Sequence, residues 1–318
     1  MYREFYRFSE EPFDLQPDPR FLYLARSHFE ALSAMMSGIQ ERKGVIVVTG
    51  EAGIGKTLLI YALLKDLSKK IRTAFVFNPQ PDFAQLLKSI LRDLGVAFGP
   101  EKEDPARLVL HLQKYLQERF AQDETVSVVL DEAQNLDERT LEDLGRLFTL
   151  ETPAVKMLQL ILVGHPALDF KLNSDKLRPL KKRIALRCRI RPLDRNEGSG
   201  YLKYRLKLAG RDFSEVFTSE AANRVWEFAG GIPRVMNLLC SRALSIGYHH
   251  SSPVIDSQIV QEAIQELTYL RAGKTRANRF AFFRGKTKSK VLRILFFLFS
   301  LLAFLLSLSL VLPLFLRK

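Results

Sequence analysis

The sequence predicts an α/β fold in which a five-stranded parallel sheet carries helices on both faces. Three observations support this fold class. Apolar runs alternate with helical patterns from residue 28 to about residue 192, which is typical of parallel strands joined by crossover helices. A glycine-rich segment follows the first apolar run, and an acidic pair follows the third. Helical patterns and then a long apolar segment complete the chain, so we also expect a small all-α domain and a C-terminal membrane helix.

The five predicted strands are short runs rich in valine, isoleucine and leucine. Because these runs are nearly continuously apolar, we expect strands that are buried on both faces of the sheet. They cover residues 45–49, 73–77, 126–130, 158–163 and 184–190. Amphipathic patterns predict the intervening helices near residues 56–70, 82–94, 105–122 and 137–150.

Only helices are predicted after Pro192. Gly230 and Gly231 end one helical pattern and Pro233 begins the next, in agreement with the usual stop and start signals of helices. The predicted helices of this part lie near residues 195–209, 218–229, 232–248 and 255–270.

The excess of positive charge belongs to the C-terminal part of the chain. The 318 residues include 48 Lys+Arg and 35 Asp+Glu, a net charge of +13. Eleven of the basic residues and none of the acidic ones lie in 271–318, which leaves residues 1–270 nearly neutral. A basic surface for nucleic acid is therefore not required to explain the composition. The two cysteines, Cys188 and Cys240, exclude a secreted scaffold with several disulfides.

Residues 294–316 are predicted to form a transmembrane helix. This run of 23 residues contains no charged side chain, and a helix of that length spans about 35 Å, enough for the hydrocarbon core of a bilayer. Nine basic residues lie in 271–293, so the positive-inside rule predicts that the preceding residues are cytoplasmic and the C-terminus periplasmic. The N-terminus carries acidic residues and no apolar core, and we expect no cleaved signal peptide.

The glycine-rich segment matches the pattern G-x-x-x-x-G-K-[ST] and lies between a predicted strand and a predicted helix, the context of a phosphate-binding loop. Backbone N–H groups of such a loop surround phosphates, and the helix N-terminus adds partial positive charge. We expect Lys56 to neutralise the β- and γ-phosphate oxygens and the Thr57 hydroxyl to bind Mg²⁺. The predicted nucleotide-binding residues are Gly50, Glu51, Ala52, Gly53, Ile54, Gly55, Lys56, Thr57 and Leu58.

The acidic pair Asp131–Glu132 follows the apolar strand 126–130. A carboxylate in this position reaches the metal, and a second one reaches the water that attacks the γ-phosphate. We therefore predict that Asp131 binds Mg²⁺ and that Glu132 is the base that activates water. The second carboxylate favours ATP hydrolysis over nucleotide binding alone.

The phosphate-binding loop, the Asp131–Glu132 pair and the sequence Gly-Gly-Ile-Pro-Arg at 230–234 together resemble an AAA+ ATPase. Further segments are similar to the ExeA/GspA-type secretion ATPases, whose family includes MshM-like pilus-biogenesis ATPases and the ATPases of exosortase (PEP-CTERM) loci. The resemblance covers residue 1 to about residue 268. The matching segments are 12–13, 17–23, 28–32, 158–164, 177–180, 182–184, 233–234 and 237–240.

The resemblance implies roles for several further residues. Arg234 would be the second sensor, which reaches from a helical lid to the γ-phosphate. Arg183 would be the arginine finger in a neighbouring subunit's site; Arg178 competes for this role, and a solvated basic face is the other interpretation. His165 stands at the sensor-one position, where relatives carry Gln, and a purely structural histidine is equally open. A finger that acts in trans implies a homo-oligomer.

The implied domain organisation follows from these matches. It comprises an N-terminal segment with the first helix of the ATPase module, the P-loop ATPase domain, a helical lid, a basic juxtamembrane linker and the transmembrane helix, at residues 1–44, 45–192, 193–270, 271–293 and 294–316. ExeA-like proteins continue into a periplasmic peptidoglycan-binding domain, which we expect to be lacking here. The aromatic residues of the N-terminal segment either clamp an adenine base or pack the segment onto the sheet; they are Phe5, Tyr6, Phe8, Phe13, Phe21 and Tyr23.

The sequence thus predicts a membrane-anchored AAA+ ATPase of the bacterial inner membrane. It would use ATP and Mg²⁺ to support the assembly or operation of a secretion, envelope-export or pilus-assembly system. One alternative is a nucleotide-gated membrane scaffold with slow turnover. Another is a DNA-dependent ATPase of the transposition type, which the nearly neutral charge of residues 1–270 disfavours.

Overall fold

The computed structural model describes residues 2–99, 104–148 and 156–269. The chain divides into two compact units, residues 1–261 and residues 262–318. The sheet, its flanking helices and the helices up to α12 all belong to the first unit. These elements contain the candidate site.

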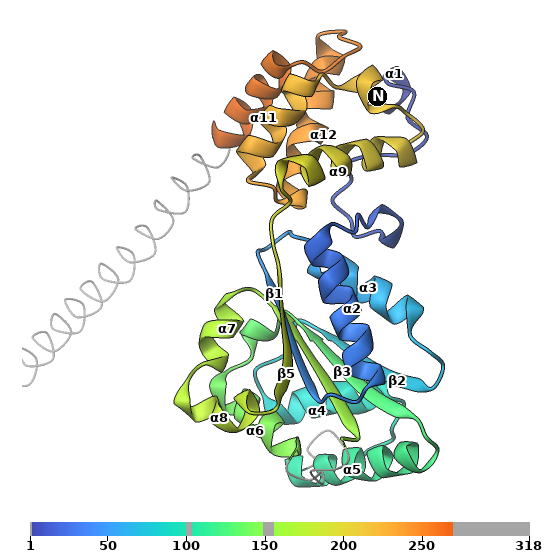
Figure 1. The fold of residues 1–318 in the computed structure, drawn as a ribbon, viewed down its shortest axis with the longest axis vertical. Helices are drawn as coiled ribbons and strands as arrows, with labels where there is room; N and C mark the ends of the chain where they lie inside the picture. Colours follow the sequence, from blue (N-terminus) through green and yellow to red (C-terminus); the bar gives the residue numbers. More distant parts are fainter. Residues whose placement is uncertain (1, 100–103, 149–155, 270–318) are drawn as a thin grey trace, which may run out of the picture. The chain divides into compact units, whose positions relative to one another are not determined.

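The sheet has five parallel strands in the order β2-β3-β4-β1-β5, which confirms the predicted fold class (Figure 1). Each predicted strand agrees with the observed one to within two residues. The strands are β1 (Val45–Gly50), β2 (Ile71–Phe77), β3 (Thr125–Asp131), β4 (Leu158–Gly164) and β5 (Ile184–Ile190).

Helices cover both faces of the sheet because successive strand residues point to opposite sides. Ile46 and Val48 of β1 pack with α2 (Arg26–Gln40) and α3 (Lys56–Asp66). Val45 and Val47 belong to the core on the opposite face. That face is covered by α4 (Phe83–Asp93), α5 (Pro105–Ala121) and α6 (Glu138–Leu147).

An aspartate precedes each of the helices α4, α5 and α6. Asp82, Asp104 and Asp137 each precede a helix, and each carboxylate accepts a hydrogen bond from a backbone N–H of the first turn. These contacts satisfy donors that a helix N-terminus leaves without a partner. They explain why α4, α5 and α6 begin where they do.

Three short helical segments connect β4 to β5, in a stretch where no helix was expected from the sequence. They are α7 (Ala167–Leu172), η4 (Asp175–Leu177) and α8 (Arg178–Lys181). The segments are only 6, 3 and 4 residues long, too short to show a helical period in the sequence. Lys171 of α7 donates from Nζ to the backbone oxygens of Gln134 (2.7 Å) and Leu136 (2.6 Å), so α7 is fixed to the loop that follows β3.

The described residues after β5 are mostly helical, as predicted. Asp194 and Glu197 form a capping box at the start of α9 (Arg195–Leu208). Gly231 adopts a φ of 72°, and a Cβ at this position would lie 2.2 Å from the oxygen of Leu193, so only glycine fits. The other helices are α10 (Phe213–Val216), α11 (Ser219–Ala229), α12 (Pro233–His249) and a last helix at 257–269.

The N-terminal segment, which includes α1 (Tyr2–Phe5) and η1 (Pro19–Phe21), packs against the helices that follow β5. The hydroxyl of Tyr6 donates to the oxygen of Ser252 (2.9 Å), and the rings of Phe13 and Phe217 meet edge to face at 6.1 Å. Of the two interpretations that the sequence left open for these aromatics, packing is thus present for Tyr6 and Phe13. Their partner is the helical region and not the sheet.

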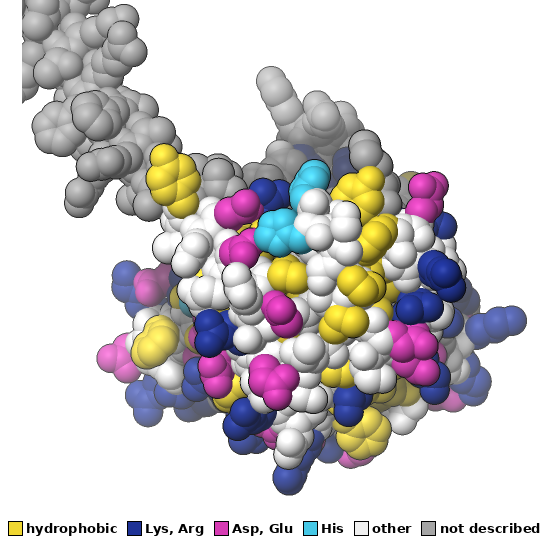
Figure 2. All heavy atoms as spheres, turned by 90° about the horizontal axis from the view of Figure 1, so that it is seen from above, with side chains coloured by type: hydrophobic (Ala, Val, Ile, Leu, Met, Phe, Trp, Pro, Cys, Tyr) yellow, Lys and Arg dark blue, Asp and Glu magenta, His cyan; other side chains and the backbone are white. Residues whose placement is uncertain are grey.

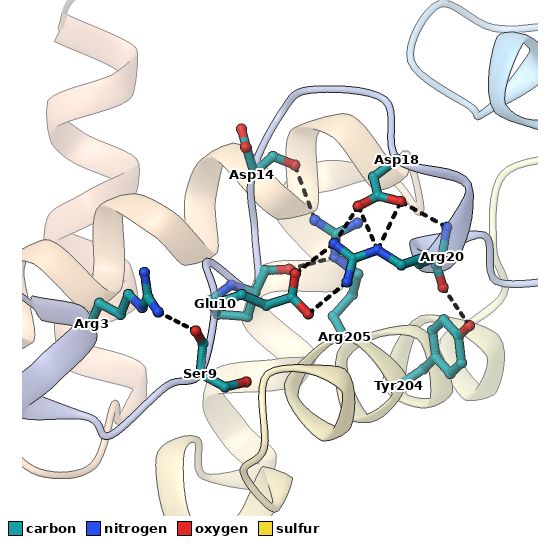
Figure 3. A network of polar contacts seen from close by, with 9 residues as sticks. Arg3, Ser9, Glu10, Asp14, Asp18, Arg20, Tyr204 and Arg205 are labelled. Carbon is teal, nitrogen blue, oxygen red and sulfur yellow. Dashed lines mark hydrogen bonds and ion pairs between the residues drawn. The ribbon is translucent and has the colours of Figure 1, made fainter.

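Arg205 of α9 joins the N-terminal segment to the helical region (Figure 3). Its Nε donates to the oxygen of Pro12 (2.5 Å), and one terminal nitrogen donates to the oxygen of Asp14 (3.0 Å). The guanidinium lies 4.1 Å from the centre of the Phe21 ring, and Arg205 is only 4% exposed. Burial lowers its pKa, because the charged form loses its hydration. The contacts make residues 12–21 a strap that is bound to α9.

In the three described ranges, no helix is both long and apolar enough to cross a membrane. The predicted linker 271–293 and the predicted transmembrane helix 294–316 lie outside the described residues.

We predict that Arg205→Ala destabilises the protein by about 3 kcal/mol, because it leaves the oxygens of Pro12 and Asp14 without their donors in a buried place. Thermal and denaturant unfolding measure this loss. Limited proteolysis should also cut the N-terminal segment faster in the variant.

The matched control is Lys207→Ala, an exposed residue of the same helix, which should change stability by less than about 0.5 kcal/mol. Equal unfolding curves for Arg205→Ala and the wild type would show that the strap is not held by this side chain.

Candidate nucleotide-binding site

The order of the strands brings the sequence motifs together. In a parallel sheet all carboxyl ends lie at one edge, where open α/β sheets bind their ligands. β4 pairs with β1 on one side and with β3 on the other. The end of β4 at Gly164 and His165 therefore lies between the glycine-rich loop after β1 and the Asp131–Glu132 pair at the end of β3.

The glycine-rich loop leads from β1 directly into α3, which begins at Lys56. Gly53 and Gly55 have φ angles of 78° and 109°, a region that residues with a side chain rarely adopt. The pattern of glycines therefore follows from the shape of the loop.

The ammonium of Lys56 lies on the loop itself. Nζ donates to the backbone oxygens of Gly50 (3.0 Å) and Glu51 (3.1 Å), and the residue is 5% exposed. Burial lowers the pKa of Lys56, and the carboxylates of Glu132, Asp131 and Glu51 act in the opposite direction. A phosphate that offered new oxygens would give this cation stronger partners than two carbonyls.

Thr57 and Asp131 connect the loop to the end of β3. The hydroxyl Oγ1 of Thr57 donates to Oδ2 of Asp131 at 2.5 Å, and Asp131 is 0% exposed. Burial raises the pKa of Asp131, while the Thr57 hydrogen bond opposes this shift. A hydroxyl and a carboxylate are the hard oxygen ligands that Mg²⁺ prefers, so this pair fits the predicted metal ligands.

The carboxylate of Glu132 is held by a neighbouring amide. Nε2 of Gln134 donates to Oε2 of Glu132 (2.5 Å), and Oε1 of Gln134 accepts from the backbone N–H of His165 (2.9 Å). The imidazole of His165 in turn lies 3.3 Å from the Glu51 carboxylate, from Nε2 to Oε2. A polar chain thus runs from the glycine-rich loop through the end of β4 to Glu132.

The side chain of His28, in α2, contacts the backbone of the glycine-rich loop. Its Nε2 lies 2.9 Å from the oxygen of Ile54, and the residue is 2% exposed. Because a carbonyl oxygen only accepts, Nε2 must carry the proton. Burial lowers the pKa of His28, which favours the neutral ring.

A pocket of about 360 Å³ opens above the loop. The backbone N–H of Arg234, at the start of α12, donates to the oxygen of Gly53 (3.2 Å), so the helical region touches the loop directly. A Cβ on Gly53 would lie 2.7 Å from Cβ of Arg234. The pocket is lined by the strap, the loop and the helical region, including Leu22, Tyr23, Lys56, Tyr201, Pro233 and Arg234.

Comparison with known proteins identifies the family. A family model described as an AAA domain matches residues 39–172. General secretion pathway protein A of Aeromonas hydrophila is 34% identical over 272 residues, which cover 85% of this chain and 49% of that protein. The chain is a GspA-like AAA+ ATPase. It has the P-loop AAA+ fold that the sequence predicted.

Solved structures show the same fold. The ORC2 protein of Aeropyrum pernix, in its ADPNP-ADP complexes, gives a TM-score of 0.62 at 17% identity and covers 81% of this chain and 72% of that one. Cdc6p of Pyrobaculum aerophilum also gives 0.62, at 18% identity, with 80% and 70% covered. These identities are low, so the likeness concerns the fold. The chain spans about half the length of the secretion-pathway protein.

Most of the predicted site residues of this GspA-like ATPase surround the pocket. The pocket is lined by residues 53–58, Glu132 and Arg234. Gly50 and Glu51 contribute through their backbone oxygens, which accept hydrogen bonds from Lys56. Ala52 is exposed at the tip of the loop.

Arg183 lies away from the chain's own pocket. Its oxygen accepts from the N–H of Val45, at the start of β1, whereas the glycine-rich loop follows the end of that strand. β1 contains six residues, so its two ends lie about 20 Å apart. Arg178 is exposed at the start of α8 and is not among the pocket residues. Neither arginine therefore belongs to the pocket of its own chain.

Several residues at the site were not predicted from the sequence. His28, Gln134 and Arg205 are the clearest of these. For Arg205 a signal existed, because Tyr201, Leu202, Arg205 and Leu206 share one face of α9 and place a charge among apolar residues. For Gln134 the signal was an amide two residues after Glu132. Nothing local distinguishes His28 from a core histidine.

In the described part of the chain, no group of three or more His, Cys, Asp or Glu side chains could hold a metal ion by itself. The predicted magnesium site differs from such a group. It combines Thr57 and Asp131 with oxygens of the nucleotide.

We predict that Lys56→Ala lowers the affinity for ATP by about 100-fold or more, because the phosphates lose a charged hydrogen-bond donor. Calorimetric titration with ATP measures the effect, and Lys65→Ala, at the exposed end of the same helix α3, is the control. Equal affinity in Lys56→Ala and Lys65→Ala would show that the nucleotide binds elsewhere.

Proposed function

We propose that this AAA+ ATPase is anchored in the bacterial inner membrane and couples ATP hydrolysis to the assembly or operation of a secretion or envelope-export system. The similarity to General secretion pathway protein A supports the secretion role. One observation carries the hydrolytic part of the proposal. A single pocket collects Lys56, Thr57 and Glu132 beside Arg234, and Asp131 lies directly behind Thr57.

The loop and the start of α3 bind the triphosphate. Backbone N–H groups at Gly53 and Gly55 and the N-terminus of α3 attract phosphate oxygens. Lys56 exchanges the carbonyls of Gly50 and Glu51 for these oxygens. Thr57 and Asp131 would hold Mg²⁺, which would supply positive charge to offset that of the phosphates.

Glu132 acts as the base for the attacking water. Its carboxylate belongs to the pocket lining, next to the buried Asp131 on the same strand end. Taking up the proton of the water in the transition state is worth about 10² to 10⁴ in rate for a base of this kind. Glu132 supplies this step, and Asp131 remains a metal ligand.

Arg234 transmits the state of the nucleotide to the helical lid. It stands at the start of α12, and its backbone already touches Gly53 of the loop. A γ-phosphate attracts the guanidinium and draws α12 toward the loop; its loss releases the helix. Because Arg205 binds the strap to α9, the strap moves with the lid. His165, between the two motifs, is the sensor-one residue.

Arg183 completes the site of a neighbouring copy. Its position at the opposite end of β1 keeps it away from its own pocket, which supports a role in trans over a role in cis. The active form is therefore a homo-oligomer, with Arg178 as the competing finger. The partners are inner-membrane components of the secretion, export or pilus-assembly system.

The anchor is the uncharged run 294–316, preceded by the basic stretch 271–293. This arrangement favours an ATPase in the cytoplasm and a C-terminus in the periplasm. Nucleic acid is not among the proposed partners. On the face drawn in Figure 2, basic and acidic side chains are interspersed and do not form one basic surface.

We predict ATP hydrolysis by the full chain in lipid nanodiscs that rises with protein concentration and is unchanged by DNA. Glu132→Gln should lower turnover by about 10²-fold or more while ATP stays bound, because the base is lost and the phosphate contacts remain. Glu118→Gln, exposed on α5, is the control and should hydrolyse ATP at the wild-type rate.

Mixing experiments test the finger in the same assay. Arg183→Ala alone should be inactive, and adding a Lys56→Ala chain should restore hydrolysis, since each variant supplies what the other lacks. Arg178→Ala mixed in the same way decides between the two arginines. Nucleotide binding without turnover would instead favour a gated scaffold, and stimulation by DNA would favour a DNA-dependent ATPase.

A further inference from the structure

Gln134 has an unusual place in this site. It lies in the short helix η2 (Ala133–Asn135), two residues after the proposed base. Its donor end meets the Glu132 carboxylate, and its acceptor end meets the N–H of His165. A carboxylate accepts and an N–H donates, so the amide can face only one way round. Each end of Gln134 thus has one matched partner.

The backbone around Gln134 is fixed from outside. Nζ of Lys171 donates to the oxygens of Gln134 and Leu136, which ties the loop after β3 to α7. The N–H of Asn135 donates to the oxygen of Glu132 at 3.0 Å and closes the turn. The side chain therefore starts from a set position and has little freedom to turn elsewhere.

The end of β4 is shaped to receive this amide. A Cβ on Gly164 would lie 2.5 Å from Oε1 of Gln134, closer than any side chain allows. A side chain at this position would displace the amide from between the two strand ends. The contact between Gln134 and the sensor-one segment depends on this space.

Glu132 itself is held in a backbone conformation that non-glycine residues seldom adopt. Its φ is 57° and its ψ is 35°, in the left-handed region. Strained residues at a site persist because their surroundings hold them, and they point to a role for the side chain. The hydrogen bond from Gln134 fixes where that carboxylate points.

We infer that Gln134 is a positioning residue that aims the Glu132 carboxylate and ties it to the sensor-one end of β4. This inference rests on the proposed role of Glu132 as the base. A shift of the β4 end at His165 would move the Gln134 amide, and the amide would in turn move the Glu132 carboxylate. Gln134 touches no reacting atom, so its loss should lower the turnover rate and leave ATP binding intact.

Two substitutions separate this role from simple support of the turn. Gln134→Met keeps the length of the side chain and removes both hydrogen bonds. Gln134→Glu keeps an acceptor for the His165 N–H and removes the donor to Glu132. Asn135→Asp is the control, because it makes the same charge change one residue on, where the side chain meets Asn78.

In the full chain, Gln134→Met and Gln134→Glu should each lower kcat by about 10- to 100-fold, as expected when a base is misplaced by about 1 Å. Their affinity for ATP and their Tm should stay within error of the wild type, and Asn135→Asp should keep the wild-type kcat. Combined with Glu132→Gln, Gln134→Met should cause no further loss, because the base is already gone.

Three results with the variants would overturn the inference. Gln134→Glu with wild-type kcat would show that the donor is not needed. Loss of ATP affinity and Tm together with kcat would indicate a structural role. Additive losses in the double variant would mean that Gln134 acts independently of Glu132. A wild-type chain that does not hydrolyse ATP would contradict the proposed function first, and this inference with it.

Discussion

The buried carboxylate of Asp131 is the constraint around which the site is arranged. A charge without hydration is costly unless donors hold it, and here the Thr57 hydroxyl and the Glu132 N–H each donate to one of its oxygens. The first donor fixes the start of α3 and the second fixes the turn after β3. Because β1, β4 and β3 are neighbouring parallel strands, these contacts also determine where Lys56 and Glu132 stand.

The strap and the helical region both contribute residues to the pocket lining. The strap of residues 12–21 leaves its contacts with α9 shortly before α2 begins, and α9 begins shortly after β5 ends. The strap and the lid are thus bound to each other and joined to the sheet through short connections. The contact between Arg234 and Gly53 is where this body meets the phosphate loop. In the proposed function, this contact is where nucleotide binding would influence the position of the lid.

Sequence reasoning succeeded where the signal was local. β1, β3 and β4 are nearly continuous apolar runs that are buried throughout, and the glycine-rich loop is a contiguous motif, so both could be read from short windows. The edge strands β2 and β5 are only partly buried, so the prediction of strands buried on both faces is wrong for these two. Arg205 illustrates what could not be predicted, because its partner Pro12 is 193 positions away in the chain. His28 contacts the loop through the backbone oxygen of Ile54. This contact depends on the packing of α2, so neither the sequence of α2 nor that of the loop predicts it. The family resemblance supplied Arg183, but only the strand register shows that this residue lies far from its own pocket.

Asp131 and Thr57 are expected to hold the metal of a nucleotide bound in this pocket. The most direct test is calorimetric titration of the full chain with ATP, with and without Mg²⁺, for the wild type and for Asp131→Asn. The wild type should bind ATP more tightly with Mg²⁺, and Asp131→Asn should lose about tenfold or more of that gain. The exposed Asp66→Asn at the end of α3 should keep it. An equal gain from Mg²⁺ in all three proteins would show that Asp131 does not hold the metal.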